Sequence, residues 1–135
     1  MYMKKLFILL ALVASLCSCA DANKKRANEL IAEYQQKYEL ASQEVNNLMV
    51  PFSEEEWNYV LAYAAYYANE TAIVVGENWD LNMQPLKEDR LSLAGKVEKA
   101  KIPLTSAQQA VCSKYAEAEM YLITTHVLRR WLEIH

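Results

Sequence analysis

Apolar residues recur every three or four positions over most of the chain, which is the period of an α-helix that packs one face against its neighbours. In the first such segment the spacing is 4-3-4-3-4-3, and Pro51 ends the pattern. Tyrosines and alanines make this stripe wider and less uniform than a leucine zipper, so we expect the helix to pack within its own bundle rather than to dimerise. The stripe consists of Ala27, Ile31, Tyr34, Tyr38, Ala41, Val45 and Leu48.

A second helix is predicted to begin after Ser53, which forms a capping box with Glu56. Residues 57–75 are apolar on two faces, as expected of a helix between two neighbours. The β-branched residues at 71–75 also allow a short strand, but we favour a helix that Gly76 terminates. One stripe is Trp57, Leu61, Ala64, Ala68, Thr71 and Val75, and the other is Tyr59, Tyr63, Tyr66, Glu70 and Ile73.

Two further helices follow a polar loop at residues 77–84. Pro85 suits the first turn of a third helix over residues 86–101, and Thr105 with Gln108 forms a second capping box, which opens a long helix from Ser106 to about residue 133. Short connections favour antiparallel neighbours, so the sequence predicts an all-α fold, an antiparallel bundle of about four helices. The apolar stripe of the last helix is Cys112, Ala116, Met120, Ile123, Val127, Trp131 and Ile134, widened by Val111, Tyr115, Ala118 and Leu122.

The first twenty residues have a different pattern. Two lysines at positions 4 and 5 precede an apolar run over residues 6–16, in which Ser15 is the one polar residue, and small residues follow it. This order is typical of an export signal. A helix over residues 6–20 would be roughly 22 Å long at ~1.5 Å per residue, which is short of the ~30 Å hydrocarbon core and argues against an uncleaved membrane anchor.

The junction Leu16-Cys17-Ser18-Cys19 resembles the lipobox of bacterial lipoproteins, with an aliphatic residue three positions before the final cysteine and a small residue directly before it. The resemblance covers only these N-terminal residues. It implies that residues 1–18 are a lipoprotein signal peptide and that Cys19 becomes the lipidated N-terminus. Residues 19–26 would then form a short tether before a single helical domain over residues 27–135. The alternative is an ordinary signal peptide, cut near Ala20.

The resemblance to a lipobox implies a protein on the periplasmic side of a bacterial cell envelope. Lipidation would hold it at the membrane, because two or more acyl chains give long-lived membrane residence. In Gram-negative lipoproteins an acidic residue directly after the cysteine favours retention in the inner membrane. Ala20 occupies that position here, which slightly favours the outer membrane. The membrane is therefore the first expected partner, and Lys24, Lys25 and Arg26 are close enough to the lipid to contact anionic headgroups.

Composition and charge exclude several classes of protein. The 135 residues suffice for one domain, and a net charge of −3 shows no basic excess of the kind that binds nucleic acid. The three cysteines are too few for a disulfide framework, and Cys112 is interpreted as a buried apolar residue rather than a nucleophile. We find no catalytic motif and no ligand set for a metal, and the two histidines, His126 and His135, lie far apart in sequence. We expect no enzyme activity, no cofactor and no metal, and we interpret His126 as a residue packed in the bundle.

Tyrosines are the unusual feature, with nine in the chain and four between positions 59 and 67. A stripe of Tyr59, Tyr63 and Tyr66 either fills the core or borders a groove, and Tyr67 is expected on a different side of the helix. In a groove these rings suit recognition of a protein or of an amphipathic ligand. Trp79, in the polar loop, either caps the end of the bundle or is an exposed anchor for a partner.

These observations predict a non-enzymatic, lipid-anchored helical module that binds an envelope or secreted protein, as an inhibitor, immunity protein or adaptor does. The alternative is a binder of a small hydrophobic or aromatic ligand in a tyrosine-lined cleft between helices. An enzyme would require Glu70, His126 and a tyrosine to converge on one substrate.

Overall fold

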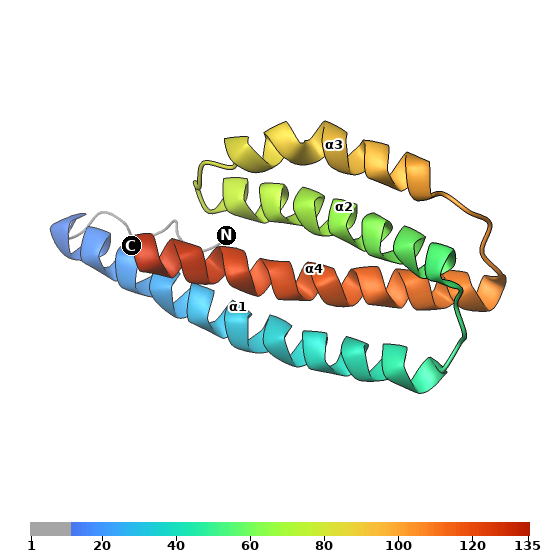
Figure 1. Ribbon diagram of the computed structural model, residues 1–135. Helices are drawn as coiled ribbons and strands as arrows, with labels where there is room; N and C mark the ends of the chain where they lie inside the picture. Colours follow the sequence, from blue (N-terminus) through green and yellow to red (C-terminus); the bar gives the residue numbers. More distant parts are fainter. Residues whose placement is uncertain (1–11) are drawn as a thin grey trace.

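The computed structural model describes the backbone of residues 12–135 and the side chains of residues 21–135. The fold is all-α, with α1 (Leu12–Leu48), α2 (Glu54–Asn78), α3 (Gln84–Ala100) and α4 (Ser106–Ile134) (Figure 1). The predicted bundle of four helices is therefore confirmed. Residues 71–75 belong to α2, so the helical alternative for that segment is correct.

The helices lie side by side in one layer, in the order α3, α2, α4, α1 (Figure 1). Helix α1 packs on α4, α4 on α2 and α2 on α3, and no other pair of these four helices is in contact. Consecutive helices run in opposite directions, whereas the two central helices, α2 and α4, run parallel. Because the helices form a layer rather than a closed square, α2 and α4 each keep two sides free of neighbouring helices.

The N-termini of α2 and α4 lie together and share one hydrogen-bond network. In each capping box the side chain at the cap accepts the N–H three residues on, at 3.1 Å for Ser53 and Glu56 and at 3.1 Å for Thr105 and Gln108. Gln108 Nε2 also donates to Glu56 Oε1 at 2.9 Å and to the Pro51 carbonyl at 3.1 Å. Both predicted capping boxes are confirmed. The backbone N–H of Ser53, above all, holds the pKa of Glu56 below its usual value.

The end of α2 differs from the prediction. The helix continues past Gly76 to Asn78, and the left-handed residue that follows is Asp80, with φ 59°. Gly76 is buried inside the helix because the side chain of Met83 lies against it. A Cβ at position 76 would lie 2.6 Å from Met83 Cγ and 2.8 Å from Met83 Cε. The glycine therefore permits a close approach, and its predicted role as a helix stop is wrong.

The core lies along the two central helices and their contact with α1, and α3 contributes no buried residue. Leu128 is completely buried although the predicted stripe omits it, because α4 packs on two sides and needs two apolar faces. Ile134, at the end of the predicted stripe, is exposed, and so is Leu48 of α1. The buried apolar residues are Ala27, Ile31, Ala41, Val60, Ala64, Ala72, Ile73, Met83, Val111, Cys112, Ala116, Ala118, Val127, Leu128 and Trp131.

The contact between α1 and α4 contains a stacked pair of aromatic rings, Tyr34 and Tyr121, with centroids 5.9 Å apart. Lys37 Nζ lies over both rings, 5.1 Å and 5.8 Å from their centroids. The Tyr121 hydroxyl donates to Glu117 Oε2 at 2.6 Å. This hydrogen bond is the main reason that the pKa of Tyr121 is raised to about 12 and that the pKa of Glu117 is lowered.

The proposed lipid attachment falls at the edge of the described part of the chain. Most of the predicted signal peptide, residues 1–18, lies outside the described residues, and nothing is described of the Cys19 side chain. The backbone of residues 19–26, the expected tether, is helical and forms part of α1. Within the part of the chain that the structure describes, no helix combines the length and the apolar character needed to cross a membrane.

Candidate tyrosine site on α2

Four tyrosines of α2 form a ladder of contacting rings. The centroids of Tyr59 and Tyr63 lie 6.2 Å apart, and those of Tyr63 and Tyr67 lie 4.7 Å apart. Tyr66 meets Tyr67 edge-on at 6.0 Å. We call these four residues the tyrosine ladder. The predicted placement of Tyr67 on a different side of the helix is wrong, since it packs on Tyr63: residues four positions apart lie on the same helix face.

The ladder lies on a side of α2 that the neighbouring helices leave partly open. Tyr67 is 42% exposed, whereas Tyr59, Tyr63 and Tyr66 are half-buried. Val74, two turns after Tyr67, is also exposed. The tyrosines are therefore neither fully inside the core nor fully in solvent, since their rings pack on one another and part of their surface stays accessible.

A cleft of about 410 Å³ adjoins the first two rings of the ladder. It lies between α2, the first turns of α4 and the segment that connects α3 to α4. Gln109 Nε2 donates to the Leu104 carbonyl at 3.2 Å and so holds the connecting segment against α4. Tyr66 and Tyr67 do not line the cleft. The lining residues are Tyr59, Tyr63, Lys101, Ile102, Pro103, Leu104, Gln109, Cys112 and Ser113.

The Tyr63 phenol and the Cys112 thiol stay protonated at neutral pH. Hydrogen bonding to Tyr67, together with burial, raises the pKa of Tyr63 to about 12. Burial likewise raises the pKa of the Cys112 thiol. Cys112 is buried, so its interpretation as a packed apolar residue is confirmed. Lys101 is the one charged residue among those that line the cleft.

Trp79 lies away from the ladder. It follows the last residue of α2, about 18 Å along the helix axis from Tyr67 at ~1.5 Å per residue. Its ring packs edge-on against Trp131 at 4.8 Å, and Trp131 in turn stacks on His135 at 4.4 Å. These contacts account for an indole in a polar loop, so the tyrosine site does not include Trp79.

Glu70 and His126, the two side chains considered for catalysis, have different surroundings. Glu70 Oε1 pairs with Arg90 Nε of α3 at 3.2 Å. His126 is exposed on α4, so its interpretation as a packed bundle residue is wrong; a residue on the free side of a layer has no neighbouring helix to cover it. Residues 21–135 contain no group of three or more His, Cys, Asp or Glu side chains placed to hold a metal ion.

The sequence does not single out the non-tyrosine part of the cleft. Residues 101–104 and the side chains of Gln109 and Ser113 carry no motif, and a proline between two helices indicates only a connection. Their position follows from the layer, because α3 and α4 are not neighbours and the segment between them must pass beside α2. Comparisons of the chain with known protein families, with curated proteins and with solved structures gave no match.

Proposed function

We propose that this protein is a non-enzymatic, lipid-anchored helical module on the periplasmic side of a bacterial envelope, and that it binds a protein partner through the tyrosine ladder. Of the two membranes, Ala20 after Cys19 slightly favours the outer one. The partner is an envelope or secreted protein, and the module acts as an inhibitor, immunity protein or adaptor. The observation that carries this proposal is the run of contacting tyrosines on an open helix face, ending at Tyr67, which is 42% exposed.

Packed tyrosines suit such a surface for two physical reasons. Each ring offers a large apolar area and a hydroxyl that can bond to a partner, which is why tyrosine is enriched at binding hot spots. The ladder also orders its rings before binding, since the Tyr63 ring already contacts both Tyr59 and Tyr67. Less side-chain entropy is then lost when a partner docks.

Site-specific photo-crosslinking in cells tests the partner surface. A photoreactive phenylalanine analogue replaces Tyr67 in the full chain, and the same analogue replaces Leu91, which is 84% exposed on α3, as a matched control. We expect a discrete covalent adduct with one protein from position 67 and none from position 91. Tyr63→Ala in the same chain should weaken the adduct, because position 67 loses the ring against which it packs. Identical adducts from positions 67 and 91, or no adduct from either, would refute the proposal.

The lipid anchor is tested separately with a metabolically incorporated alkyne fatty acid. The resemblance of residues 16–19 to a lipobox predicts acylation of Cys19. Cys19→Ser should abolish labelling and release the protein from the membrane fraction, whereas Cys17→Ser should leave both unchanged. An intact Met1 in the mass spectrum of the purified protein would contradict this part of the proposal.

A second function is favoured by the cleft beside Tyr59 and Tyr63, namely binding of a small hydrophobic or aromatic ligand. Its volume of about 410 Å³ lies in the range typical of small-molecule sites, ~300–1,000 Å³. The two functions share Tyr59 and Tyr63, but other residues separate them. Tyr66→Ala should affect a protein partner at the ladder, and filling the cleft from Ser113 should affect a small ligand.

A further inference from the structure

The charge of the cleft differs in sign from that of the chain. The protein has a net charge of −3, and removal of Lys4 and Lys5 with a signal peptide would make it −5. Yet the nine residues that line the cleft include one cation, Lys101, and no carboxylate. A small anion that enters the cleft would therefore meet an opposite charge and no acidic side chain in the lining, whereas a cation would meet the ammonium group of Lys101.

Apolar and polar groups occupy different parts of the same lining. The rings of Tyr59 and Tyr63 come from α2, and the aliphatic side chains of residues 102–104 come from the connecting segment. Gln109 and Ser113 of α4 add an amide and a hydroxyl. A flat aromatic ring can pack against the tyrosines while a polar substituent reaches these groups and Lys101.

We propose that this cleft binds a small aromatic anion, an aryl carboxylate or aryl sulfonate, with its ring against Tyr59 and Tyr63 and its acid group beside Lys101. The inference rests on the second function proposed above and names the class of ligand for it.

Three features keep the cleft suited to such a ligand. The hydrogen bond from Gln109 to the Leu104 carbonyl fixes one wall, and Pro103 restricts the backbone of that wall. The pKa of Tyr63, raised to about 12, keeps its phenol neutral, so it adds no negative charge. The burial of Cys112, and the raised pKa that results, do the same for its thiol.

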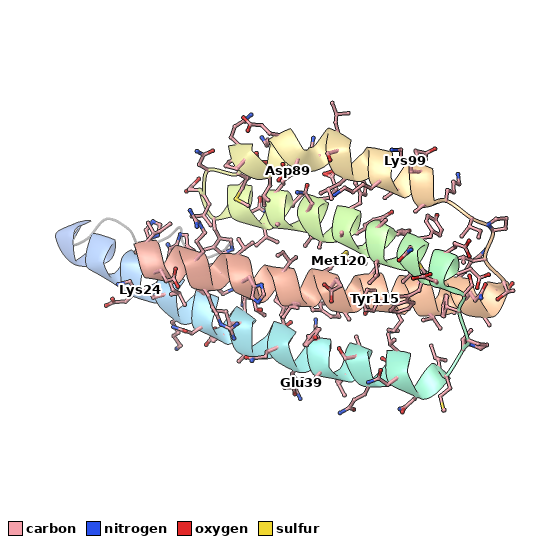
Figure 2. All side chains as sticks on the ribbon, in the orientation of Figure 1. Lys24, Glu39, Asp89, Lys99, Tyr115 and Met120 are labelled. Atoms are coloured by element: carbon pink, nitrogen blue, oxygen red, sulfur yellow. The ribbon has the colours of Figure 1, made fainter. Side chains whose placement is uncertain are left out.

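Calorimetric titration of the full chain in detergent with two matched probes tests the proposal. The probes are 2-naphthoate, an aryl carboxylate, and 2-naphthylmethylamine, an aryl cation of similar size. We expect 2-naphthoate to bind at least about tenfold more tightly. Lys101→Gln should weaken naphthoate binding about fivefold, the size expected when one exposed charge pair of roughly 1 kcal/mol is lost. Lys99→Gln, in the last turn of α3 (Figure 2) and outside the lining, should leave it unchanged.

Two variants at one exposed position locate the ligand. Ser113→Trp fills the cleft and should abolish naphthoate binding, whereas Ser113→Ala, which removes only the hydroxyl group, should weaken it far less. Equal affinity for the two probes, or naphthoate binding that survives Ser113→Trp in a folded protein, would overturn the proposal. Tyr66→Ala, combined with the photoreactive analogue at position 67, distinguishes the two functions, because Tyr66 contacts Tyr67 but does not line the cleft. It should weaken the adduct with the protein partner and leave naphthoate binding intact. Loss of both together would refute a separate ligand cleft.

Discussion

Replacing the two glycines of the chain with alanine should change stability in opposite directions. At Gly95, in α3, the added methyl group would have nothing within 4 Å, whereas a methyl group at Gly76 would overlap the buried side chain of Met83. Neither glycine has a positive φ, so alanine can adopt both backbone conformations. The difference between the two variants therefore isolates the contact between position 76 and Met83.

The magnitudes follow from two competing effects. Alanine is favoured over glycine in a helix interior by about 1 kcal/mol, so Gly95→Ala should stabilise the protein by about that amount. At Gly76 the same gain opposes an overpacking cost of roughly 1–3 kcal/mol, because Met83 is only 8% exposed and must move within a packed site. We expect Gly76→Ala to destabilise the protein by about 1 kcal/mol overall.

Thermal and urea unfolding followed by circular dichroism measure both changes. A difference of about 1 kcal/mol corresponds to a shift of roughly 4 °C in Tm for a domain of this size. A double-mutant cycle with Met83→Ala adds a sharper test. Met83→Ala alone should cost about 2–5 kcal/mol, and the double variant should be more stable than the sum of the two single changes, because the new methyl group fills part of the space that the methionine leaves.

Equal stabilisation by Gly76→Ala and Gly95→Ala would show that Met83 yields to the new methyl group without cost, and so would refute the expected clash. Strict additivity in the cycle would also refute it, since additive effects mean that the two side chains do not compete for one space.

Three further predictions concern the helix termini and the contact between α1 and α4. Gln108→Ala should lower the free energy of unfolding by roughly 1–3 kcal/mol in urea titrations, because it removes one capping box and the buried donor to Pro51 and Glu56. The pKa of Glu56 in the folded protein is lowered from its ordinary value of 4.5. Its contribution to stability is therefore present above pH 4.5 and is lost as the pH falls through the lowered pKa. In a series of urea titrations, Glu56→Gln should make the free energy of unfolding fall less steeply at acidic pH. Tyr121 should ionise near pH 12 in ultraviolet titrations, so its contribution to stability is present below pH 10 and is lost between about pH 10 and 12. Tyr121→Phe should remove its part of the absorbance change near pH 12, and the part that comes from Tyr63 should remain.

The starts of α2, α3 and α4 are the part of the fold most accessible from sequence. Ser53 with Glu56 and Thr105 with Gln108 define helix starts through contacts three residues apart, and Pro85 lies in the first turn of α3. These signals are local, so they need no knowledge of which helices are neighbours.

The features that were missed depend on contacts between distant residues. A single apolar stripe along α4 omits Leu128, because its burial requires α1 on the side opposite α2. Gly76 has the sequence context of a helix stop, and its actual role depends on Met83 beyond the next turn. The tyrosines were found as a group, but whether they filled a core or bordered a cleft depended on the path of residues 101–104.

The position of α3 at the edge of the layer has a consequence for the size of ligand that the cleft accepts. Of the other helices, α3 contacts only α2, and none of its residues is buried. Its C-terminal end, at Ala100, continues directly into residues 101–104, which form one wall of the cleft. Its displacement is opposed by packing of Leu86 on the core, by the ion pairs of Glu70 with Arg90 and of Glu77 with Lys87, and by the hydrogen bond from Asn69 to the Leu86 carbonyl. If α3 moved outward, the cleft would become larger while the other three helices stayed packed. The cleft volume of about 410 Å³ is therefore not an upper limit on the size of the ligand.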